Sequence, residues 1–467
     1  MLSRLSLRHT VLSRQRISIE HTGLMLTSPI NSRSRQGAPA AWLKQLIDDD
    51  SAPPKLFAWT TANLSPGSTP LSNDNTRLKS QSHTTPLERI YILGIGNLGR
   101  LFASSLARLP KKPPITLVVH RKSLLEQWAS SPGIEITRHG KVERTSDFDV
   151  EWWTHEKPPA GPILEPTSGA GITNLIVATK ASDALPQVDR LRGYLGRDST
   201  VTFVQNGMCK LWPPMGDLYL HHRFPDLSGP SWVACVTTHG VTSLAPFKSI
   251  HASPANVSVG PVSLNPESGG SAQYLMNQIA DAPDLSGQIV SKADLWVLQL
   301  EKLVVNSTIN PLTAILGCKN GELFIDREDR LPLIIKTLVH EAGLVLTSLV
   351  SDVSSADILN DESNGSPLHS REGPRDALIQ RLSSTNLLTM LYEVGYKVRE
   401  NTSSMLQDVR AGKKTEIRDF NGWLVETARF LDLGSAVPTH EKLIKLVENG
   451  ASLSRDELCD KLISSSQ

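Results

Sequence analysis

The chain has 467 residues, 39% hydrophobic and 20% charged, which is typical of a globular protein long enough for two domains. Its 48 Lys and Arg residues nearly balance 47 Asp and Glu residues, and this net charge of +1 argues against a dedicated nucleic-acid-binding protein. The longest apolar runs are too short to predict a membrane-spanning helix. Four cysteines without a C-x-x-C pair argue against a disulfide framework or a metal site and predict a reducing compartment.

Residues 1–86 predict a leader followed by a disordered linker. The first 35 residues contain six arginines, no lysine and a single acid, Glu20, a composition that is typical of a mitochondrial transit peptide. An extension without a targeting role, which would leave the protein in the cytoplasm, is the alternative. The remaining stretch is rich in Ser, Thr, Pro and Asn and has no sustained periodicity, so we expect it to stay disordered.

Residues 87–290 predict an α/β domain. Buried-strand patterns occur in RIYILG and at 115–120, 173–180 and 198–207, and helical patterns separate them. Because strands alternate with helices, we expect a Rossmann domain with a parallel sheet covered on both faces.

The first predicted strand is followed by a glycine motif, G-x-G-x-x-G, formed by Gly94, Gly96 and Gly99. The first glycine allows a tight turn, the second lets a pyrophosphate approach the backbone, and the third lets helix and strand pack closely. The motif therefore predicts a dinucleotide site that includes Asn97 and Leu98 at the start of the helix. A glycine-rich turn that binds no ligand is the alternative.

The second predicted strand ends in VVHRKS, with no acid to bind the ribose hydroxyl of NAD. Arg121 can instead pair with a 2′-phosphate, so we expect NADPH as the cofactor. The alternative is that Arg121 and Lys122 are a solvated basic pair.

Residues 291–467 predict a helical domain, in which one helix carries a polar stripe. Lys302, Asn306 and Asn310 are four residues apart, so they lie on one face of that helix among apolar neighbours. The stripe indicates side chains that face a cleft, or else a lysine that extends past buried asparagines. Lys180 ends the third predicted strand and Asn206 lies in the QNG turn just after the fourth, at strand ends where open α/β sheets bind their ligands.

These motifs together resemble the ketopantoate reductase (2-dehydropantoate 2-reductase) family. The resemblance rests on GIGNLG, ATKASD, VQNGM, EKLVVNSTINPLTAI and SSMLQDVRAGKKTEI, and runs from about Arg89 into the 440s. It implies a Rossmann domain, an all-α C-terminal domain for substrate binding and dimerisation, and a site between them. The implied reaction is the NADPH-dependent reduction of ketopantoate to pantoate, a step in pantothenate and coenzyme A biosynthesis.

The resemblance also implies a role for each matched residue. Lys302 matches the general acid that protonates the ketone oxygen, and Glu416 matches the carboxylate that supports the site. Lys180 matches a residue beside the nicotinamide. The positions that match substrate-binding residues are Asn206, Asn306, Asn310 and Ser404, of which Asn206 also borders the cofactor.

Two alternatives remain beside this interpretation. Insertions at 211–230 and 351–374 and the leader depart from the family pattern, which leaves a reductase of another 2-keto acid open. A non-catalytic, RNA-associated mitochondrial protein on the same scaffold is the second alternative. We expect a small 2-keto acid as the ligand, no nucleic acid and no membrane as partners, and leave a homodimer open.

Overall fold

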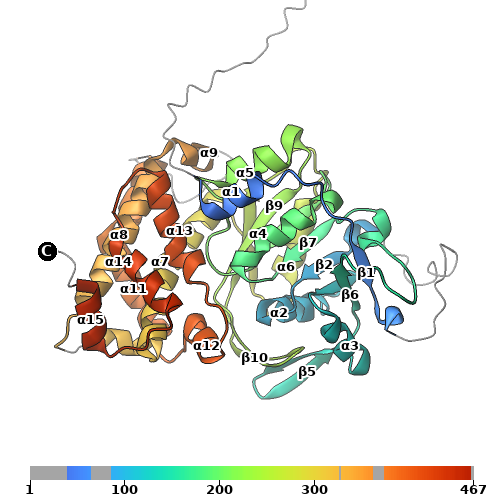
Figure 1. Ribbon diagram of the computed structural model, residues 1–467, viewed down its shortest axis with the longest axis horizontal. Coiled ribbons are helices and arrows are strands. Elements are labelled where there is room, and N and C mark those ends of the chain that lie inside the picture. Colours follow the sequence, from blue (N-terminus) through green and yellow to red (C-terminus); the bar gives the residue numbers. More distant parts are fainter. Residues whose placement is uncertain (1–38, 65–85, 326–327, 361–372, 464–467) are drawn as a thin grey trace, which may run out of the picture. The chain divides into compact units, whose positions relative to one another are not determined.

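The computed structural model describes residues 39–64, 86–325, 328–360 and 373–463, which belong to one compact unit within Gly37–Gln467. Strands and helices are interspersed up to β13 (Gly287–Ile289), and every described element from α7 (Lys292–Leu316) onward is helical. Figure 1 shows the sheet region and the helical region that follow from this order. The predicted fold class, a parallel α/β domain followed by a helical domain, is confirmed.

The main sheet has nine strands. Six neighbouring strands in its centre run parallel, and only the pairs β1–β6 and β9–β12 are antiparallel. In spatial order the strands are β1 (Phe57–Trp59), β6 (Asp149–Thr154), β3 (Ile115–Val119), β2 (Ile90–Leu93), β7 (Asn174–Val177), β8 (Thr200–Phe203), β9 (Ser231–Thr237), β12 (Val257–Ser263) and β13. The four strands predicted from the sequence are β2, β3, β7 and β8.

Both faces of the main sheet are covered, as predicted. In β2 all four residues are buried, with Ile90 and Ile92 in one hydrophobic cluster and Tyr91 and Leu93 in the other. Since successive side chains of a strand point to opposite faces, the two clusters lie on the two faces of the sheet. The helices that cover the sheet region are α2 (Asn97–Leu106), α3 (Lys122–Ser130), α4 (Ala181–Arg190), α5 (Gly216–Arg223) and α6 (Ser271–Asp281).

A second, smaller sheet was not predicted. Its four strands, in spatial order, are β10 (Gly240–Ala245), β11 (Lys248–Ser253), β4 (Ile134–Arg138) and β5 (Lys141–Thr145). The hairpin of β10 and β11 contacts α2, the helix that follows the glycine motif. This contact places the smaller sheet beside the predicted dinucleotide site.

The helical region shares one hydrophobic cluster with the sheet. Val177 and Phe203 of the sheet belong to the same cluster as Leu303 of α7 and Phe420. Helix α8 is long and apolar enough to cross a membrane by length and composition, but its apolar side chains are mostly buried, as in a core helix. The helices after α7 are α8 (Leu331–Ser351), α9 (Ala356–Leu359), α10 (Pro374–Arg381), α11 (Ser384–Lys397), α12 (Ser404–Arg410), α13 (Ile417–Phe430), α14 (Pro438–Glu448) and α15 (Arg455–Ile463).

The prediction that residues 1–86 are a leader and a disordered linker is wrong for residues 39–64. This segment contains α1 (Ala41–Ile47) and β1, and β1 extends the main sheet by pairing with β6. Leu43 and Leu56 are fully buried, so tertiary contacts stabilise a segment too short to show a periodicity of its own. Residues 1–38, which carry the predicted transit peptide, and 65–85 lie outside the described residues.

Candidate active site

Three strand ends of the main sheet meet at one edge. Leu93, Val177 and Phe203 are the last residues of β2, β7 and β8, and the parallel pairing places them side by side. Gly94, Lys180 and Asn206 therefore emerge together at the carboxyl edge of the sheet, where open α/β sheets bind ligands.

The glycine motif forms a turn packed tightly against the loop after β7. Gly94 has φ +96°, and a Cβ on it would lie 2.9 Å from the carbonyl carbon of Ala178. A Cβ on Gly99 would lie 2.0 Å from the oxygen of Gly94. A Cβ on Gly96 would meet no protein atom closer than 3.8 Å, so the fold itself does not require glycine there. The free space above Gly96 fits the close approach of a pyrophosphate.

The start of α2 fits the same ligand. Gly96 is the N-cap residue of α2 and has no side chain that could accept a hydrogen bond. The amides of Asn97 and Leu98, the first two of the helix, therefore have no side-chain cap. The Asn97 side chain itself donates to the carbonyl of Val241 in β10 at 2.8 Å. Arg121 is exposed and lies between the end of β3 and the start of α3. These residues would hold a dinucleotide mainly through backbone amides, with Arg121 available to a phosphate.

Lys302 joins the helical region to the sheet edge. From α7 its Nζ donates to Oδ1 of Asn206 at 2.9 Å and to the carbonyl oxygen of Thr237 at 2.5 Å. Burial lowers the pKa of Lys302 to about 8, although the negative charge of Glu416 opposes this shift. An ammonium group has three N–H donors, so one remains for a substrate oxygen.

A second contact across the same edge involves Lys180. Its Nζ lies 2.6 Å from Oδ2 of Asp408 in α12. Burial alone would lower the pKa of Lys180, but the charges of Glu416 and Asp408 outweigh it and the net shift is upward. Glu416 is buried directly before α13 and accepts from the amide of Ala181 at 3.4 Å; its burial raises its pKa against the charge of Lys180.

The remaining predicted residues lie on the same elements. Asn306 and Asn310 follow Lys302 on α7, and Ser404 is the first residue of α12. Within the described residues, no side-chain hydrogen bond joins these three to Lys302. Asn306 lines a cavity of about 10 Å³ together with Lys302. The structure thus places the predicted residues at one sheet edge and on α7, α12 and α13, and their individual roles stay predictions.

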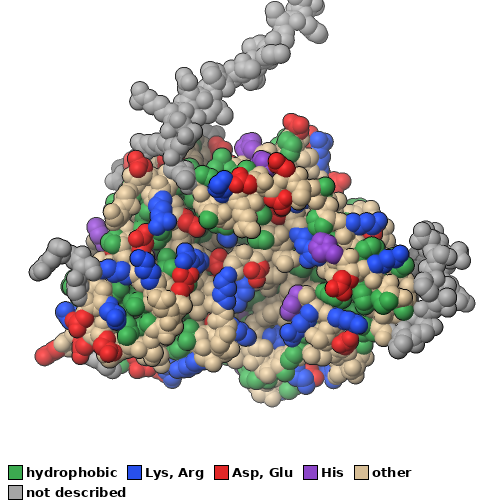
Figure 2. All heavy atoms as spheres, in the orientation of Figure 1, with side chains coloured by type: hydrophobic (Ala, Val, Ile, Leu, Met, Phe, Trp, Pro, Cys, Tyr) green, Lys and Arg blue, Asp and Glu red, His purple; other side chains and the backbone are tan. Residues whose placement is uncertain are grey.

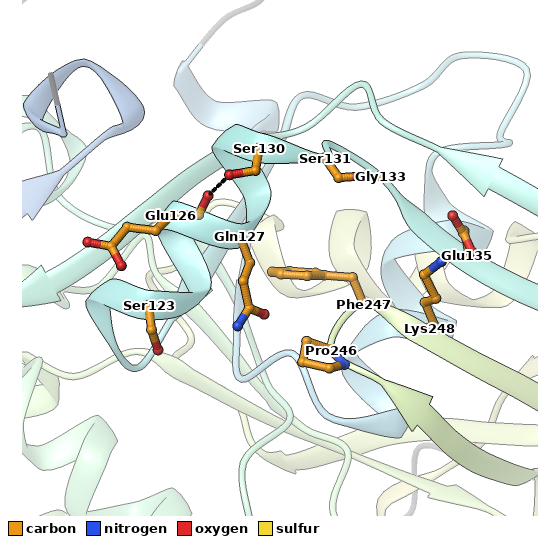
Figure 3. Close-up of a pocket in the computed structure, with 10 residues that line it drawn as sticks. All are labelled: Ser123, Glu126, Gln127, Ser130, Ser131, Gly133, Glu135, Pro246, Phe247 and Lys248. Atoms are coloured by element: carbon orange, nitrogen blue, oxygen red, sulfur yellow. Dashed lines mark hydrogen bonds and ion pairs between the residues drawn. The ribbon is translucent and has the colours of Figure 1, made fainter.

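Figure 2 shows the molecule hollowed over the part where Figure 1 draws α2, with Lys and Arg side chains near the rim. A different hollow, of about 460 Å³, lies between α3 and the β10–β11 turn and is lined by Gln127 and Phe247 (Figure 3). That second hollow contains none of the predicted site residues.

Two family profiles match the chain, one over the sheet region and one over the helical region. The profile of the ketopantoate reductase family (PanE/ApbA) matches residues 90–263, and the profile of its C-terminal domain matches residues 294–451. A ketoisovalerate reductase of Gibberella fujikuroi is 43% identical over 442 residues, which cover 89% of this chain and 97% of the relative. The chain belongs to the ketopantoate reductase family.

Other relatives in the family differ in the substrate that they are named for. A ketoisovalerate reductase of Beauveria bassiana is 40% identical, over 91% of this chain and 98% of the relative. A probable 2-dehydropantoate 2-reductase of Schizosaccharomyces pombe is 26% identical, over 78% of this chain and 97% of the relative. The structure of D-mandelate dehydrogenase with NADH and anilino(oxo)acetate has the same fold, with a TM-score of 0.56 and 16% identity, over 79% of this chain and 99% of that one. As a member of this family, the protein is an oxidoreductase that acts on a 2-keto acid.

Several residues at this sheet edge were not among the predicted site residues. Thr237 contributes a backbone carbonyl, for which a sequence carries no signal. Asp408 lies in the matched motif SMLQDVR and its acidic side chain could have been singled out. Gln205 and Gln299 line the small cavity beside Lys302, and Gln299 accepts from the indole of Trp212. Through Trp212 the 211–230 insertion therefore reaches the wall of the site.

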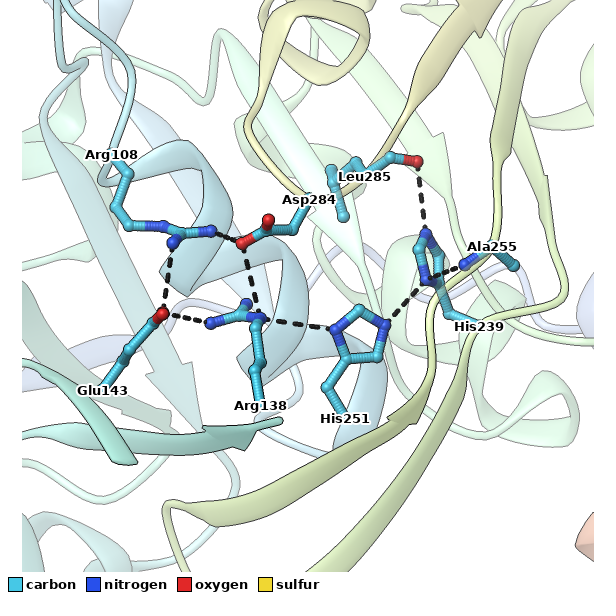
Figure 4. Close-up of polar contacts among 8 residues, drawn as sticks. All are labelled: Arg108, Arg138, Glu143, His239, His251, Ala255, Asp284 and Leu285. Carbon is cyan, nitrogen blue, oxygen red and sulfur yellow. Dashed lines mark hydrogen bonds and ion pairs between the residues drawn. The ribbon is translucent and has the colours of Figure 1, made fainter. Parts of the chain in front are cut away.

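His239 and His251 form a buried pair (Figure 4), and the amide of His239 donates to the hydroxyl of Thr237 at 3.2 Å. The Nδ1 of His239 lies 2.9 Å from Nε2 of His251 and also accepts from the amide of Ala255 at 3.0 Å. Arg138 Nε donates to Nδ1 of His251 at 3.3 Å. The contacts assign a single direction: Arg138 donates to His251, His251 donates to His239, and His239 Nε2 donates to the carbonyl of Leu285. In this arrangement both imidazoles are neutral.

Acid is expected to destabilise the protein through this pair. Burial, then repulsion by His239 when it is protonated and by Arg138, lower the pKa of His251 to about 4, whereas the unfolded chain keeps the ordinary value of about 6.5. The unfolded state therefore binds more protons, and the stability that is present above pH 6.5 is lost as the pH falls toward 4. From pH 7 to pH 5 the loss is about 2 kcal/mol for His251 alone.

The loss can be measured as the free energy of unfolding in urea at pH 7 and pH 5. His251→Gln is expected to lower stability at pH 7 and to flatten this pH dependence, because glutamine does not titrate. His222→Gln, which changes an exposed histidine of α5, is the matched control and should keep the wild-type slope. An unchanged slope in His251→Gln would contradict the assignment of the neutral pair.

Proposed function

We propose that the protein reduces 2-ketoisovalerate, or a closely related branched 2-keto acid, to the 2-hydroxy acid with NADPH. The observation that carries the proposal is the contact of Lys302 with Asn206 and Thr237 at the sheet edge. The substrate is favoured by the two ketoisovalerate reductases, which are 43% and 40% identical over almost their whole length.

The reduction adds a hydride to the carbonyl carbon and a proton to the carbonyl oxygen. Bound NADPH supplies the hydride, and its pyrophosphate would lie on the glycine turn and the first amides of α2. Lys302 holds a proton at Nζ, and a pKa of about 8 keeps this group protonated yet able to release the proton near neutral pH. The same ammonium stabilises the negative charge that develops on the oxygen.

The other polar side chains orient the substrate. Asn206 fixes Nζ of Lys302 by accepting its hydrogen bond, and the carbonyl of Thr237, the last residue of β9, fixes it from a second side. Asn306, Asn310 and Ser404 offer neutral donors to the carboxylate of a 2-keto acid.

Ketopantoate is the second candidate substrate. It differs from 2-ketoisovalerate by a hydroxymethyl group on the branched carbon, which needs a hydrogen-bonding partner when it is buried. Ser404 can supply one, and the relative of Schizosaccharomyces pombe supports this candidate. A role in pantothenate biosynthesis depends on this second candidate.

The NADPH preference rests on Arg121, which is exposed at the end of β3 and has no acidic residue beside it in VVHRKS. A mitochondrial location, supported by the Arg-rich leader, and a homodimer are part of the same proposal and need separate tests.

The proposal predicts the outcome of a panel that crosses two keto acids with two cofactors. We expect kcat/KM for 2-ketoisovalerate to exceed that for ketopantoate, and NADPH to be preferred over NADH. Arg121→Ala is expected to raise KM for NADPH roughly tenfold with little effect on NADH, since only NADPH carries the 2′-phosphate.

The substrate prediction and the Arg121 prediction would be contradicted by different results. A higher kcat/KM for ketopantoate would favour the second candidate, and no turnover of either acid by folded protein would contradict both. An Arg121→Ala variant that loses NADPH and NADH affinity equally would contradict the contact with a 2′-phosphate.

A further inference from the structure

Arg100 is a buried cation at the end of the first turn of α2, and it connects the glycine turn to the smaller sheet. It is 3% exposed. Its Nε donates to the carbonyl of Gly96 at 3.3 Å, and Nη2 donates to Oδ1 of Asn97 at 2.8 Å. Arg100 also donates to the β10–β11 hairpin. Its Nη2 donates to the Ser243 hydroxyl at 2.9 Å, and its Nη1 donates to the carbonyls of Ala245 and Lys248 at 2.6 and 3.0 Å.

All of these partners are neutral oxygens. Within the described residues no carboxylate forms an ion pair with Arg100. Arg138, the comparable buried arginine of the smaller sheet, is 7% exposed and pairs with Glu143 and Asp284. A buried charge without an opposite charge costs several kcal/mol, and proteins usually compensate it with a partner.

Burial lowers the pKa of Arg100 to about 10, so the guanidinium remains charged at neutral pH. Its Nε is bonded to the carbonyl of Gly96, the residue that leaves room for a phosphate and precedes the first amides of α2. A diphosphate at this helix start would therefore lie close to the guanidinium, where little water screens the attraction.

We propose that Arg100 is a positioning residue of the dinucleotide site, whose charge is compensated by the diphosphate of the bound cofactor. Its hydrogen bonds keep the β10–β11 hairpin against the glycine turn, and its charge raises the affinity of that turn for a dianion. The inference rests on the proposed nicotinamide cofactor and extends it to a residue outside the glycine motif.

Three substitutions separate the charge from the hydrogen bonds. Arg100→Lys keeps the charge and loses most of the bonds, Arg100→Gln keeps hydrogen-bonding groups and loses the charge, and Arg100→Met loses both. The dissociation constant for NADPH is measured by fluorescence titration, and inorganic pyrophosphate is titrated as a competitor of NADPH. Melting temperatures are recorded for every variant, so that changes in folding are seen separately from changes in binding.

We expect Arg100→Gln and Arg100→Met to weaken both NADPH and pyrophosphate binding about tenfold or more, and Arg100→Lys to stay within about threefold of wild type. Arg138→Met is the matched control: it removes a buried arginine that carboxylates already compensate, and should lower the melting temperature without changing pyrophosphate binding.

Three results would overturn the inference. If Arg100→Gln binds as well as Arg100→Lys, or if the pyrophosphate inhibition constant is the same in all variants, the residue acts through packing alone. If the wild-type protein binds NADPH and Arg100→Met binds it with the same affinity, the inference is also overturned. Wild-type protein that binds neither NADPH nor NADH would instead contradict the proposed cofactor, so the two failures are distinguishable.

Discussion

Lys302→Ala is expected to lower kcat for reduction of the 2-keto acid by about 10²- to 10⁴-fold, the range found when a general acid is removed. Lys302 Nζ is the only group of the described sheet edge that we assign to deliver a proton, and it is held there by Asn206 and Thr237. Without it the alkoxide that develops on the substrate loses the proton donor and the positive charge that Lys302 supplies. The measurement is kcat under saturating NADPH, with folding checked by the melting temperature.

The controls separate chemistry from folding. Among the described residues the Lys302 side chain bonds only to Asn206 and Thr237, so both Lys302→Ala and the longer Lys302→Met should fold. Lys336→Ala removes an exposed lysine from α8 and should keep wild-type kcat. If Lys302→Met retains more than about a tenth of wild-type kcat while it is folded, Lys302 is not the acid.

A pH profile tests the same assignment without a mutation. Reduction requires the protonated form of Lys302, and its lowered pKa is about 8. We therefore expect kcat/KM of the free enzyme to decline as the pH rises through about 8, and this limb should be absent in Lys302→Met.

Those parts of the fold that rest on long runs of one pattern could be predicted from the sequence. The strand Ile90–Leu93 is buried at every residue, so it appears in the sequence as an apolar run that predicts a strand. The helix that carries Lys302 extends over 25 residues, which is long enough for its apolar periodicity to predict it. Parallel pairing then places Gly94, Lys180 and Asn206 at one edge of the sheet. Much of the candidate site follows from that topology alone.

The parts that could not be predicted depend on contacts between distant segments. The strand Phe57–Trp59 has three residues and exists because β6 offers it an open edge. Thr237 contributes a backbone oxygen, which its residue type does not indicate. The sequence pattern around Arg100 is that of a surface residue on an amphipathic helix, and only its contacts with Ser243 and Ala245 show that it is buried. In each of these cases tertiary structure, and not local pattern, determines the role.

Gly96→Ala is expected to raise the dissociation constant for NADPH about tenfold or more while the melting temperature stays the same. The backbone of Gly96 has φ −73° and ψ −167°, which any L-residue adopts, and the added methyl would meet no protein atom within 3.8 Å. The folded protein therefore tolerates alanine there. A pyrophosphate that needs to approach this backbone does not, because the methyl occupies the space between them.

Two other glycines make this prediction specific. Gly99→Ala would place its methyl 2.0 Å from the oxygen of Gly94, so it should lower both stability, by about 1 to 3 kcal/mol, and cofactor affinity. Gly196→Ala, at a glycine with open space and no positive φ, should change neither. Calorimetric titration with NADPH and thermal unfolding of the three variants distinguish these outcomes. If Gly96→Ala binds NADPH as tightly as Gly196→Ala, the diphosphate does not lie against this turn, and the basis for assigning Asn97, Leu98 and Arg100 to the cofactor is lost.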